Sequence, residues 1–475
     1  MQLNLKMNKF KSSDNKQIFL LPPSVEDFVP ESHLSRLIYE VVDQLDTTDI
    51  ENKYSYLGQK SYHPKLIIRI LFYGYSTGVL SGRKLAQCCE SDMAFMYLSN
   101  MFKPDFRTIN DFRKNNITEL AGYFTSILKI CQQLGMAKAG TLIIDSVKLR
   151  ANASLRHTKT KAELETTLNI LENEIKQSIQ EAVEIDEAED KQYGKLRGDE
   201  LPAILKSKEK LAQNIRRAIS EINNADDKVN ITDTDAKVIQ DKSSKQLNYN
   251  CQTAITTDRI IVSAEATNQA SDRPGLMQTI HDAELNATTE YKNIIADAGY
   301  GSYDNYEKLV QEDRVAYIPD QKYLSNDEDN PFDRSHFIFN ENTNTFTCPL
   351  GEQLSYTSTS KSKKKQHVKI YKAKNCPQCS AQSLCTKGKY RQLHIELREQ
   401  LRDNVRKRLN SPAGKQLYKI RLHTIESIFG NLKHNLKIKQ FQLRNLKNVD
   451  AEFKIHCMMH NLKQIFKAKY QMKGV

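Results

Sequence analysis

The stretch TLIIDSVKLRANAS, residues 141–154, decides the fold of this chain. Thr-Leu-Ile-Ile is a short apolar run, which indicates a buried strand, and Asp145 stands at its end. The stretch YKNIIADAGYGS at 291–302 has the same pattern, because a second apolar run ends at Asp297 and a glycine-rich turn follows. In open sheets the carboxyl ends of adjacent strands form the ligand-binding rim. We therefore predict an α/β fold whose sheet carries both aspartates at strand ends.

Patterns around these two strands complete the sheet and its helices. Strands are predicted at 248–257 (NYNCQTAITT), 259–267 (RIIVSAEAT) and 314–320 (RVAYIPD). Helices are predicted at 274–285, from Pro412 to about residue 434, and at 449–467.

A charged region, 158–230, interrupts the strands. Apolar residues recur there at three and four residues in two stripes, separated by Gly194, Gly198 and Pro202. Two such stripes predict an antiparallel helical hairpin with a packing role. The stripes consist of Leu164, Leu168, Leu171, Ile175 and Ile179, then Leu211, Ile215, Ala218 and Ile222.

The N-terminal part is predicted to be helical throughout. In SYHPKLIIRILFYGYSTG (61–78), Pro64 suits a first turn, Ser61 a cap and Gly78 the end. KPDFRTINDFRKNN (103–116) adds a turn and a helix with Thr108 as its cap. Helix, turn and helix with surface bases fit a DNA-binding unit, although a plain helical domain fits the spacing as well. The bases are Arg83, Lys84, Arg107, Arg113 and Lys114.

Charge is distributed unevenly along the 475 residues. Residues 361–475 hold 28 Lys and Arg against 6 Asp and Glu, a balance of +22, whereas the whole chain carries +12. Clustered Lys and Arg attract phosphates, so we expect a polyanion partner. No apolar run approaches the roughly 18 residues of a membrane span, and the N-terminus lacks a signal-peptide core. We expect a cytoplasmic protein, whose nine cysteines are reduced thiols or metal ligands.

One acid, Glu426, lies inside this basic tail, in TIESIFGNLKHN at 424–435. Carboxylates from two strands and a helix could converge on hard divalent cations, since Mg²⁺ prefers oxygen ligands. Two ions about 4 Å apart would activate a water and stabilise the leaving oxygen of a phosphodiester. Taken singly, each acid is more often a cap or a surface ion pair.

Four thiols lie within a short part of the tail. Cys-x2-Cys is the chelating element of structural zinc sites, and four thiolates satisfy tetrahedral Zn²⁺. Only one pair in this chain has that spacing, so unligated cysteine is the alternative. The predicted ligands, which would staple an insertion too polar to fold on its own core, are Cys348, Cys376, Cys379 and Cys385.

Together these motifs resemble the DDE transposases of bacterial insertion sequences, whose catalytic core has an RNase H-like fold. The resemblance implies that Asp145, Asp297 and Glu426 are the catalytic acids and hold two Mg²⁺ or Mn²⁺ ions. It also implies that the first and fourth strands of the core lie side by side. Further stretches that carry it are YHPKLIIRILFYGYSTGVLSGRKL, KPDFRTINDFR and YNCQTAI.

Part of this family carries Tyr-x2-Arg-x3-Glu-x6-Lys around the glutamate. The chain has Tyr418, Arg421, Glu426 and Lys433, but with four residues between Arg421 and Glu426. Because i and i+7 share a helix face and i and i+5 do not, Lys433 is a better phosphate contact than Arg421. The candidate DNA contacts are Lys433, Arg421, Tyr418, Lys148, Arg83, Lys84, Arg107 and Arg113.

The resemblance divides the chain into four parts. Residues 1–135 would be a helical DNA-binding domain, and 138–155, 245–320 and 412–475 the RNase H-like core with the C-terminal helix. Residues 156–244 and 321–411 would be insertions. The expected partners are double-stranded DNA, as element ends and target, and a second copy of the chain on paired ends, near the bacterial nucleoid. Two alternatives stay open: a transposase-derived DNA-binding regulator without catalysis, and a metal-dependent nuclease without strand transfer.

Overall fold

The computed structural model describes residues 24–55, 60–193, 203–222, 227–241, 244–320, 330–361, 367–396 and 398–471. The predicted break between the two helical stripes, at 194–202, lies outside these residues. The chain forms two compact units, residues 1–116 with 470–475, and residues 117–469. The first unit therefore ends before α7 (Ile117–Gln133), a helix that the sequence division assigned to the N-terminal domain.

The first unit is helical in its described residues. Its helices are η1 (Val25–Phe28), α1 (Leu34–Asp43), α2 (Thr48–Glu51), α3 (Pro64–Thr77), α4 (Gly82–Ser91), α5 (Met93–Leu98) and α6 (Phe106–Asn115). Gly78 ends α3 in the left-handed conformation, as predicted.

Two predicted caps in this unit are wrong. The His63 side chain, not Ser61, accepts from the Lys65 N–H at the start of α3. At α6 the Asp105 carboxylate accepts from the backbone N–H of Arg107 and Thr108. A carboxylate placed before the first turn reaches these unpaired N–H groups, so the helix begins earlier than Thr108.

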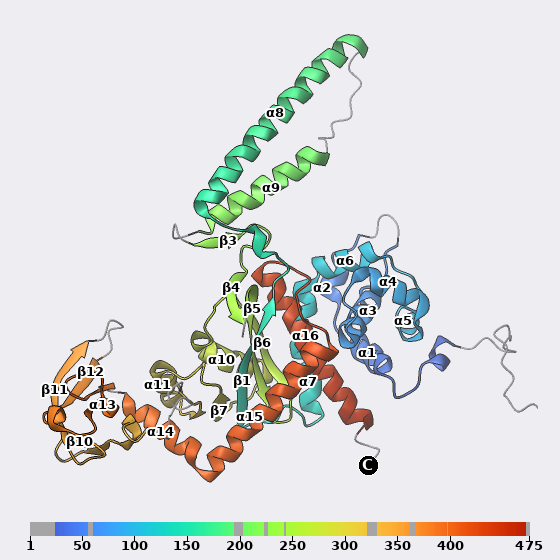
Figure 1. Cartoon of the computed structure of the whole chain (residues 1–475). Coiled ribbons are helices and arrows are strands. Elements are labelled where there is room, and N and C mark those ends of the chain that lie inside the picture. Colours follow the sequence, from blue (N-terminus) through green and yellow to red (C-terminus); the bar gives the residue numbers. More distant parts are fainter. Residues whose placement is uncertain are drawn as a thin grey trace, which may run out of the picture. The chain divides into compact units, whose positions relative to one another are not determined.

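A six-stranded mixed sheet forms the centre of the second unit, in the order β4-β5-β1-β7-β8 with β6 also paired to β5. β1 runs parallel to β7 and antiparallel to β5, and β7 runs parallel to β8 (Figure 1). The strands are β1 (Thr141–Arg150), β4 (Lys237–Asp241), β5 (Ser244–Thr256), β6 (Ile261–Thr267), β7 (Asn293–Ala296) and β8 (Val315–Tyr317). Among the predicted core strands, the first and fourth are therefore neighbours.

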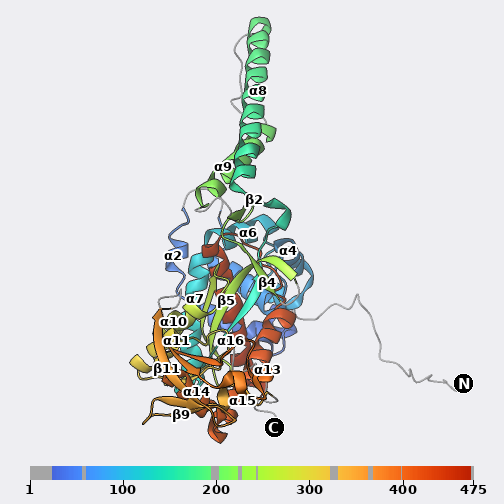
Figure 2. The ribbon, with the colours of Figure 1, turned by 60° about the vertical axis from the view of Figure 1, so that its left-hand side comes forward.

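Helices pack around this sheet. α10 (Leu276–Ala287) and α16 (Leu446–Phe466) contact β6, and α7 packs on both of these helices (Figures 1 and 2). α16 also satisfies backbone groups of β6, because Asn461 bonds to the N–H and C=O of Ile261 and Asp450 accepts from Ala266 N–H. α15 (Pro412–Gly430) contacts β1 and β7, and α14 (Glu399–Asn410) precedes it. α11 (Tyr303–Gln311) follows β7.

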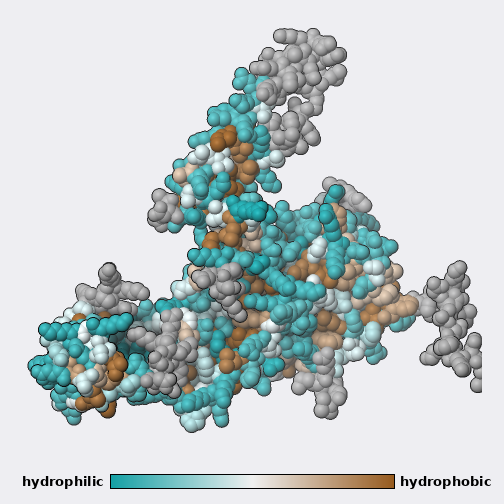
Figure 3. All heavy atoms as spheres, viewed as in Figure 1, coloured by the Kyte–Doolittle hydropathy of each residue, from teal (hydrophilic) through white to brown (hydrophobic). Residues whose placement is uncertain are grey.

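The predicted helical hairpin consists of α8 (Lys161–Tyr193) and α9 (Ala203–Ser220), and hydrophobic residues gather within it (Figure 3). The short strands β2 (Thr158–Thr160) and β3 (Lys228–Asn230) pair at its base. Its buried cluster contains Leu164, Leu171 and Ile215, as predicted, but Ala212 is buried where Leu211 was expected. Leu211 is exposed. The core-facing stripe of α9 therefore begins one residue later.

The cysteine-bearing insertion forms a five-stranded antiparallel sheet, in the order β13-β12-β11-β10-β9. Its buried cluster contains Phe337, Phe346 and Tyr371, and the rings of Phe346 and Tyr371 meet edge to face with centroids 5.0 Å apart. The insertion thus has a small core of its own, contrary to expectation. Its elements are β9 (Ile338–Asn340), β10 (Thr345–Thr347), β11 (Gln353–Lys361), β12 (His367–Ala373), η5 (Cys376–Gln378), α13 (Gln382–Cys385) and β13 (Gln392–Glu396).

These observations confirm the predicted mixed α/β fold with an N-terminal helical region. The strand order and directions of the central sheet are consistent with an RNase H-like core. None of the described helices combines the length and apolar character that crossing a membrane requires.

Candidate active site

The pairing of β1 with β7 places two aspartates next to each other. The parallel register joins Ile144 to Ala296, so Asp145 and Asp297 follow at the same level on neighbouring strands. Four buried apolar residues on these strands, Ile143, Ile144, Ile294 and Ile295, hold them in the sheet. The structure therefore brings the two predicted acids together. The predicted strand end at Asp145 is wrong, because pairing with β5 continues β1 to Arg150.

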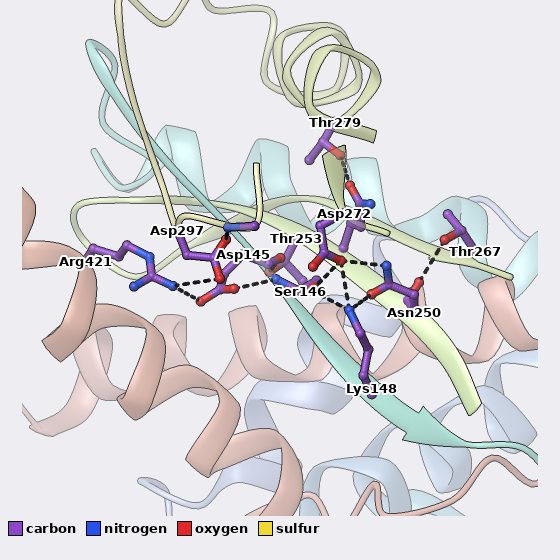
Figure 4. Close-up of polar contacts among 12 residues, drawn as sticks. Asp145, Ser146, Lys148, Asn250, Thr253, Thr267, Asp272, Thr279, Asp297 and Arg421 are labelled. Atoms are coloured by element: carbon purple, nitrogen blue, oxygen red, sulfur yellow. Dashed lines mark hydrogen bonds and ion pairs between the residues drawn. The ribbon is translucent and has the colours of Figure 1, made fainter. Parts of the chain in front are cut away.

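A cation from α15 lies between the two carboxylates. The Arg421 guanidinium is 2.7 Å from Asp145 Oδ2 and 3.9 Å from Asp297 Oδ2 (Figure 4). The side chains of Arg421 and Asp145 are each 11% exposed, so this ion pair is largely shielded from water. Each aspartate uses its other oxygen locally: Asp145 Oδ1 accepts from Ser146 N–H at 2.7 Å, and Asp297 Oδ1 from Gly299 N–H at 2.8 Å.

Burial sets the protonation of this site. It raises the pKa of Asp145 from 3.8 to about 6, although Arg421 acts in the opposite direction. The negative charges of Asp297 and Asp272 raise this pKa further. Two carboxylate oxygens thus face one cationic group, with Asp145 largely buried and Asp297 38% exposed. Such oxygens are also the ligands that Mg²⁺ and Mn²⁺ prefer.

A third aspartate beside this pair was missed in the sequence. Asp272 follows β6 by five residues, and its Oδ1 accepts from Ser146 Oγ at 2.8 Å, Lys148 Nζ at 2.8 Å and Asn250 Nδ2 at 2.7 Å (Figure 4). A Cβ at Gly299 would lie 2.9 Å from Asp297 Oδ1 and 3.4 Å from Asp272 Oδ2, so both acids approach the same glycine. In the sequence, Asp272 before Arg-Pro-Gly has the pattern of a helix start.

The loop that carries Asp272 is locked onto the sheet. A Cβ at Gly275 would lie 2.2 Å from Gln252 Oε1, so a side chain there would displace Gln252. Gln252 is buried and accepts from Thr279 Oγ1 at 2.9 Å, and Asn250 accepts from Thr267 Oγ1 through its carbonyl (Figure 4). The Asp272 carboxylate therefore has a defined position on the sheet.

Glu426 lies on α15 with an exposed side chain, five residues after Arg421, while Ile425 and Ile428 are buried. Within the parts of the chain that the structure describes, it makes no hydrogen bond or ion pair, and no three or more His, Cys, Asp or Glu form a group that could hold a metal ion. Five residues are 500° of helix, so α15 presents Arg421 and Glu426 in directions about 140° apart. The convergence of all three acids on a metal pair stays a prediction.

Two predicted DNA contacts in the core have internal partners instead. Lys148 donates to Ser146, Asn250 and Asp272, and Arg421 pairs with Asp145. Burial raises the pKa of the Tyr418 hydroxyl, beside Arg421. Lys433 is half-buried in η6 (Asn431–Asn435) and lines a surface pocket. Among the residues that the structure describes, Lys433 has no hydrogen-bond or ion-pair partner, in contrast to Lys148 and Arg421.

In the helical unit the predicted contacts also divide into two kinds. Arg83, Lys84 and Arg107 are exposed on α4 and α6. Arg113 is buried, and its guanidinium donates to Leu80 O at 2.8 Å and to Asn110 Oδ1 at 2.9 Å. It joins the loop before α4 to α6, which is a role in the fold rather than at a DNA surface.

The four predicted zinc ligands line one pocket of the insertion. Two sulfurs accept backbone hydrogen bonds, Cys348 from Glu352 N–H at 3.3 Å and Cys376 from Arg391 N–H at 3.2 Å. Burial raises the pKa of the Cys385 thiol, and the other three sulfurs add to this rise, whereas Arg391 lowers it. The four thiols share one pocket, but among the described residues they do not form a group that could hold a metal ion, so the zinc site stays a prediction.

The site thus consists of one aspartate within β1 and one directly after β7, at the same level of a mixed sheet and facing one cation. Two family models match the chain: a transposase domain (DUF772) over residues 23–115 and a transposase DDE domain over residues 347–466. Both are typical of insertion-sequence transposases, so they confirm the resemblance. The second match contains Glu426 and the four cysteines but begins after both aspartates. No curated protein matches the chain.

Proposed function

We propose that the chain is the DNA transposase of an insertion sequence. It would bind the terminal inverted repeats of the element, hydrolyse DNA at the ends to free 3′-hydroxyls, and join these to target DNA. The observation that carries the proposal is the pair Asp145 and Asp297, held at the same level on parallel strands around one cationic group.

Carboxylate oxygens are chemically suited to divalent ions. Asp145, Asp297 and Glu426 would hold two Mg²⁺ or Mn²⁺ ions, which supply activation of the attacking oxygen and stabilisation of the leaving oxygen. The protein contributes the positions of these carboxylates, because Ser146 and Gly299 N–H groups each hold one oxygen of an aspartate and leave the other turned to Arg421. Burial of Asp145 strengthens its interaction with any cation at the site.

DNA recognition would use the basic surfaces. Exposed Arg83, Lys84 and Arg107 on α4 and α6 would contact element ends, and the cationic C-terminal part would hold phosphates near the acids. Two copies of the chain would act on paired ends. The four insertion cysteines would hold a structural Zn²⁺, in addition to the aromatic core that the insertion already has.

The test compares wild type with Glu426→Gln in Mg²⁺ on end-containing DNA. The variant keeps the side chain's shape and removes its charge, so DNA binding should persist while cleavage falls by orders of magnitude. Glu290→Gln serves as control, because Glu290 is also exposed and has no hydrogen-bond or ion-pair partner among the described residues. Equal cleavage by wild type and Glu426→Gln would mean that the catalytic acid lies elsewhere.

The same assay separates the two alternatives. Wild type that binds ends but never cleaves would indicate a regulator. Wild type that cleaves but does not join ends to added target DNA would indicate a nuclease.

A further inference from the structure

A pocket beside the end of β1 is lined by four cationic side chains. These are Lys148 and Arg150 from β1, Lys433 from η6 and Lys439 from the segment that follows it. The described residues that line the pocket include no Asp or Glu. Such a concentration of cationic side chains points to an anionic ligand.

The backbone fixes the walls of this pocket. Residue Gln440 forms a parallel bridge with Arg150, and Phe441 N–H donates to Arg150 O at 3.0 Å. Leu436, Ile438 and Phe441 are buried, so the segment is seated on the core and Lys439 is directed outward between two anchors. The backbone that carries these cations is therefore held in place before a ligand binds, so only their side chains have to be ordered.

Only three of the four cations are available to a ligand. An ammonium has three donors, and Lys148 Nζ has acceptors for all of them at 3.1 Å or less: Ser146 Oγ, Asn250 Oδ1 and Asp272 Oδ1. The side chains of Arg150, Lys433 and Lys439 make no hydrogen bond or ion pair with any residue that the structure describes. Lys148 is therefore part of the wall, and the other three carry uncompensated charge.

We propose that Arg150, Lys433 and Lys439 form a binding site for one backbone phosphate of DNA. The proposal rests on the transposase function and specifies where its substrate is held. A guanidinium and two ammonium groups suit a phosphate, because the guanidinium donates in a fork and the ammonium groups act as point charges. Of these residues the sequence marked only Lys433.

The position of Arg150 along β1 predicts which DNA phosphate the site would bind, counted from the phosphate at the aspartates. Arg150 follows Asp145 by five residues, which at roughly 3.3 Å per residue is about 17 Å of strand. Phosphates of one B-DNA strand advance about 3.4 Å each along the axis. DNA that follows β1 would therefore place in the pocket a phosphate about five nucleotides from the one at the aspartates.

The experiment measures binding of an end-containing duplex as a function of salt. Arg150→Gln and Lys439→Gln should each reduce the slope of log affinity against log salt by about one. The matched control is Lys129→Gln, an exposed lysine of α7 that makes no hydrogen bond or ion pair with described residues, and its slope should equal that of wild type. Melting temperatures establish that each variant is folded.

A second measurement locates the phosphate. The affinities of wild type and Arg150→Gln are measured for a series of duplexes. In each duplex one phosphate is replaced by an uncharged methylphosphonate. Wild type should lose affinity at one position three to seven nucleotides from the cleavage site, and Arg150→Gln should lose nothing more there.

The outcomes separate the two proposals. Wild type that fails to bind or cleave end DNA overturns the proposed function. If wild type binds end DNA, two results would overturn the phosphate site alone. One is a salt dependence of affinity that is the same in wild type, Arg150→Gln and Lys439→Gln. The other is a loss of affinity on methylphosphonate substitution that is the same in wild type and Arg150→Gln.

Discussion

Arg421→Gln should destabilise the metal-free protein in a pH-dependent way. The change removes the cation that faces Asp145 in a site where both side chains are 11% exposed. Breaking a buried ion pair costs about 3–5 kcal/mol when the remaining charge cannot be neutralised. Asp145 can be neutralised, because burial already raises its pKa to about 6. The loss of stability should therefore be limited by the cost of protonating Asp145.

The magnitude follows from that pKa. Between pH 4 and 6 the folded wild type binds more protons than the unfolded chain, so this group's contribution to the free energy of unfolding falls as pH rises and then levels off. At pH 7 the contribution of Asp145 is unfavourable by about 3 kcal/mol for a pKa of about 6 against 3.8. A carboxyl that stays protonated without Arg421 would cost about 4 kcal/mol at that pH.

The extra loss through Asp145 is thus at most about 1 kcal/mol at pH 7. It is close to zero at pH 5 and reaches at most about 3 kcal/mol at pH 8, because the variant continues to lose stability above pH 6.

The assay is urea unfolding at pH 5, 7 and 8 in the presence of a chelator. Lys419→Gln is the control, since it removes one charge from an exposed position of the same helix. Its difference from wild type should not change with pH. The coupling between Arg421 and the protonation of Asp145 would be refuted if the stability lost in Arg421→Gln did not depend on pH. A greater loss of stability at pH 5 than at pH 8 would refute it as well.

Three further expectations follow from the structure. Protein purified without chelator should contain about one zinc per chain, and Cys379→Ser should lower both zinc content and melting temperature. A zinc content and a melting temperature that are both unchanged in Cys379→Ser would contradict a structural zinc site. Lys148→Met should destabilise more than the Lys148→Met, Asp272→Asn double variant in urea unfolding, because the single change leaves a carboxylate without its cation. A milder single variant would argue against the pairing. Gly275→Ala should cost about 1–3 kcal/mol of stability, because the added methyl group would collide with Gln252. Gly122→Ala is the control and should be neutral or stabilising, because no atom lies within 4 Å of the added methyl group. Equal melting temperatures for the two variants would refute the predicted collision.

Features that depend on local pattern and chain topology were predictable from the sequence. The runs before Asp145 and Asp297 are apolar on successive residues, which is typical of strands buried on both faces. Two such strands are neighbours in the mixed sheet of this protein, so the acids meet. The hairpin of α8 and α9 was equally predictable, because its apolar residues recur at helical spacing over several turns.

Small displacements of the same pattern were not predictable. Leu211 is more apolar than Ala212, yet Ala212 faces α8, since the close approach of two helices favours the smaller side chain. Thr108 and Ser61 are good caps by residue type, but Asp105 and His63 lie nearer the free N–H groups.

What the sequence by itself determined, then, was the pair of strand-borne acids, the mixed α/β fold and the angle between Arg421 and Glu426 on their helix. Only the tertiary structure decided which of these two side chains α15 directs at Asp145, because that depends on how Ile425 and Ile428 seat the helix against β1 and β7. It also decided the partners of Asp272, whose contacts with Ser146 and Lys148 span 126 and 124 residues. Hydrogen bonds of a few ångströms across such separations have no periodic signature in a sequence, so the fold alone reveals them.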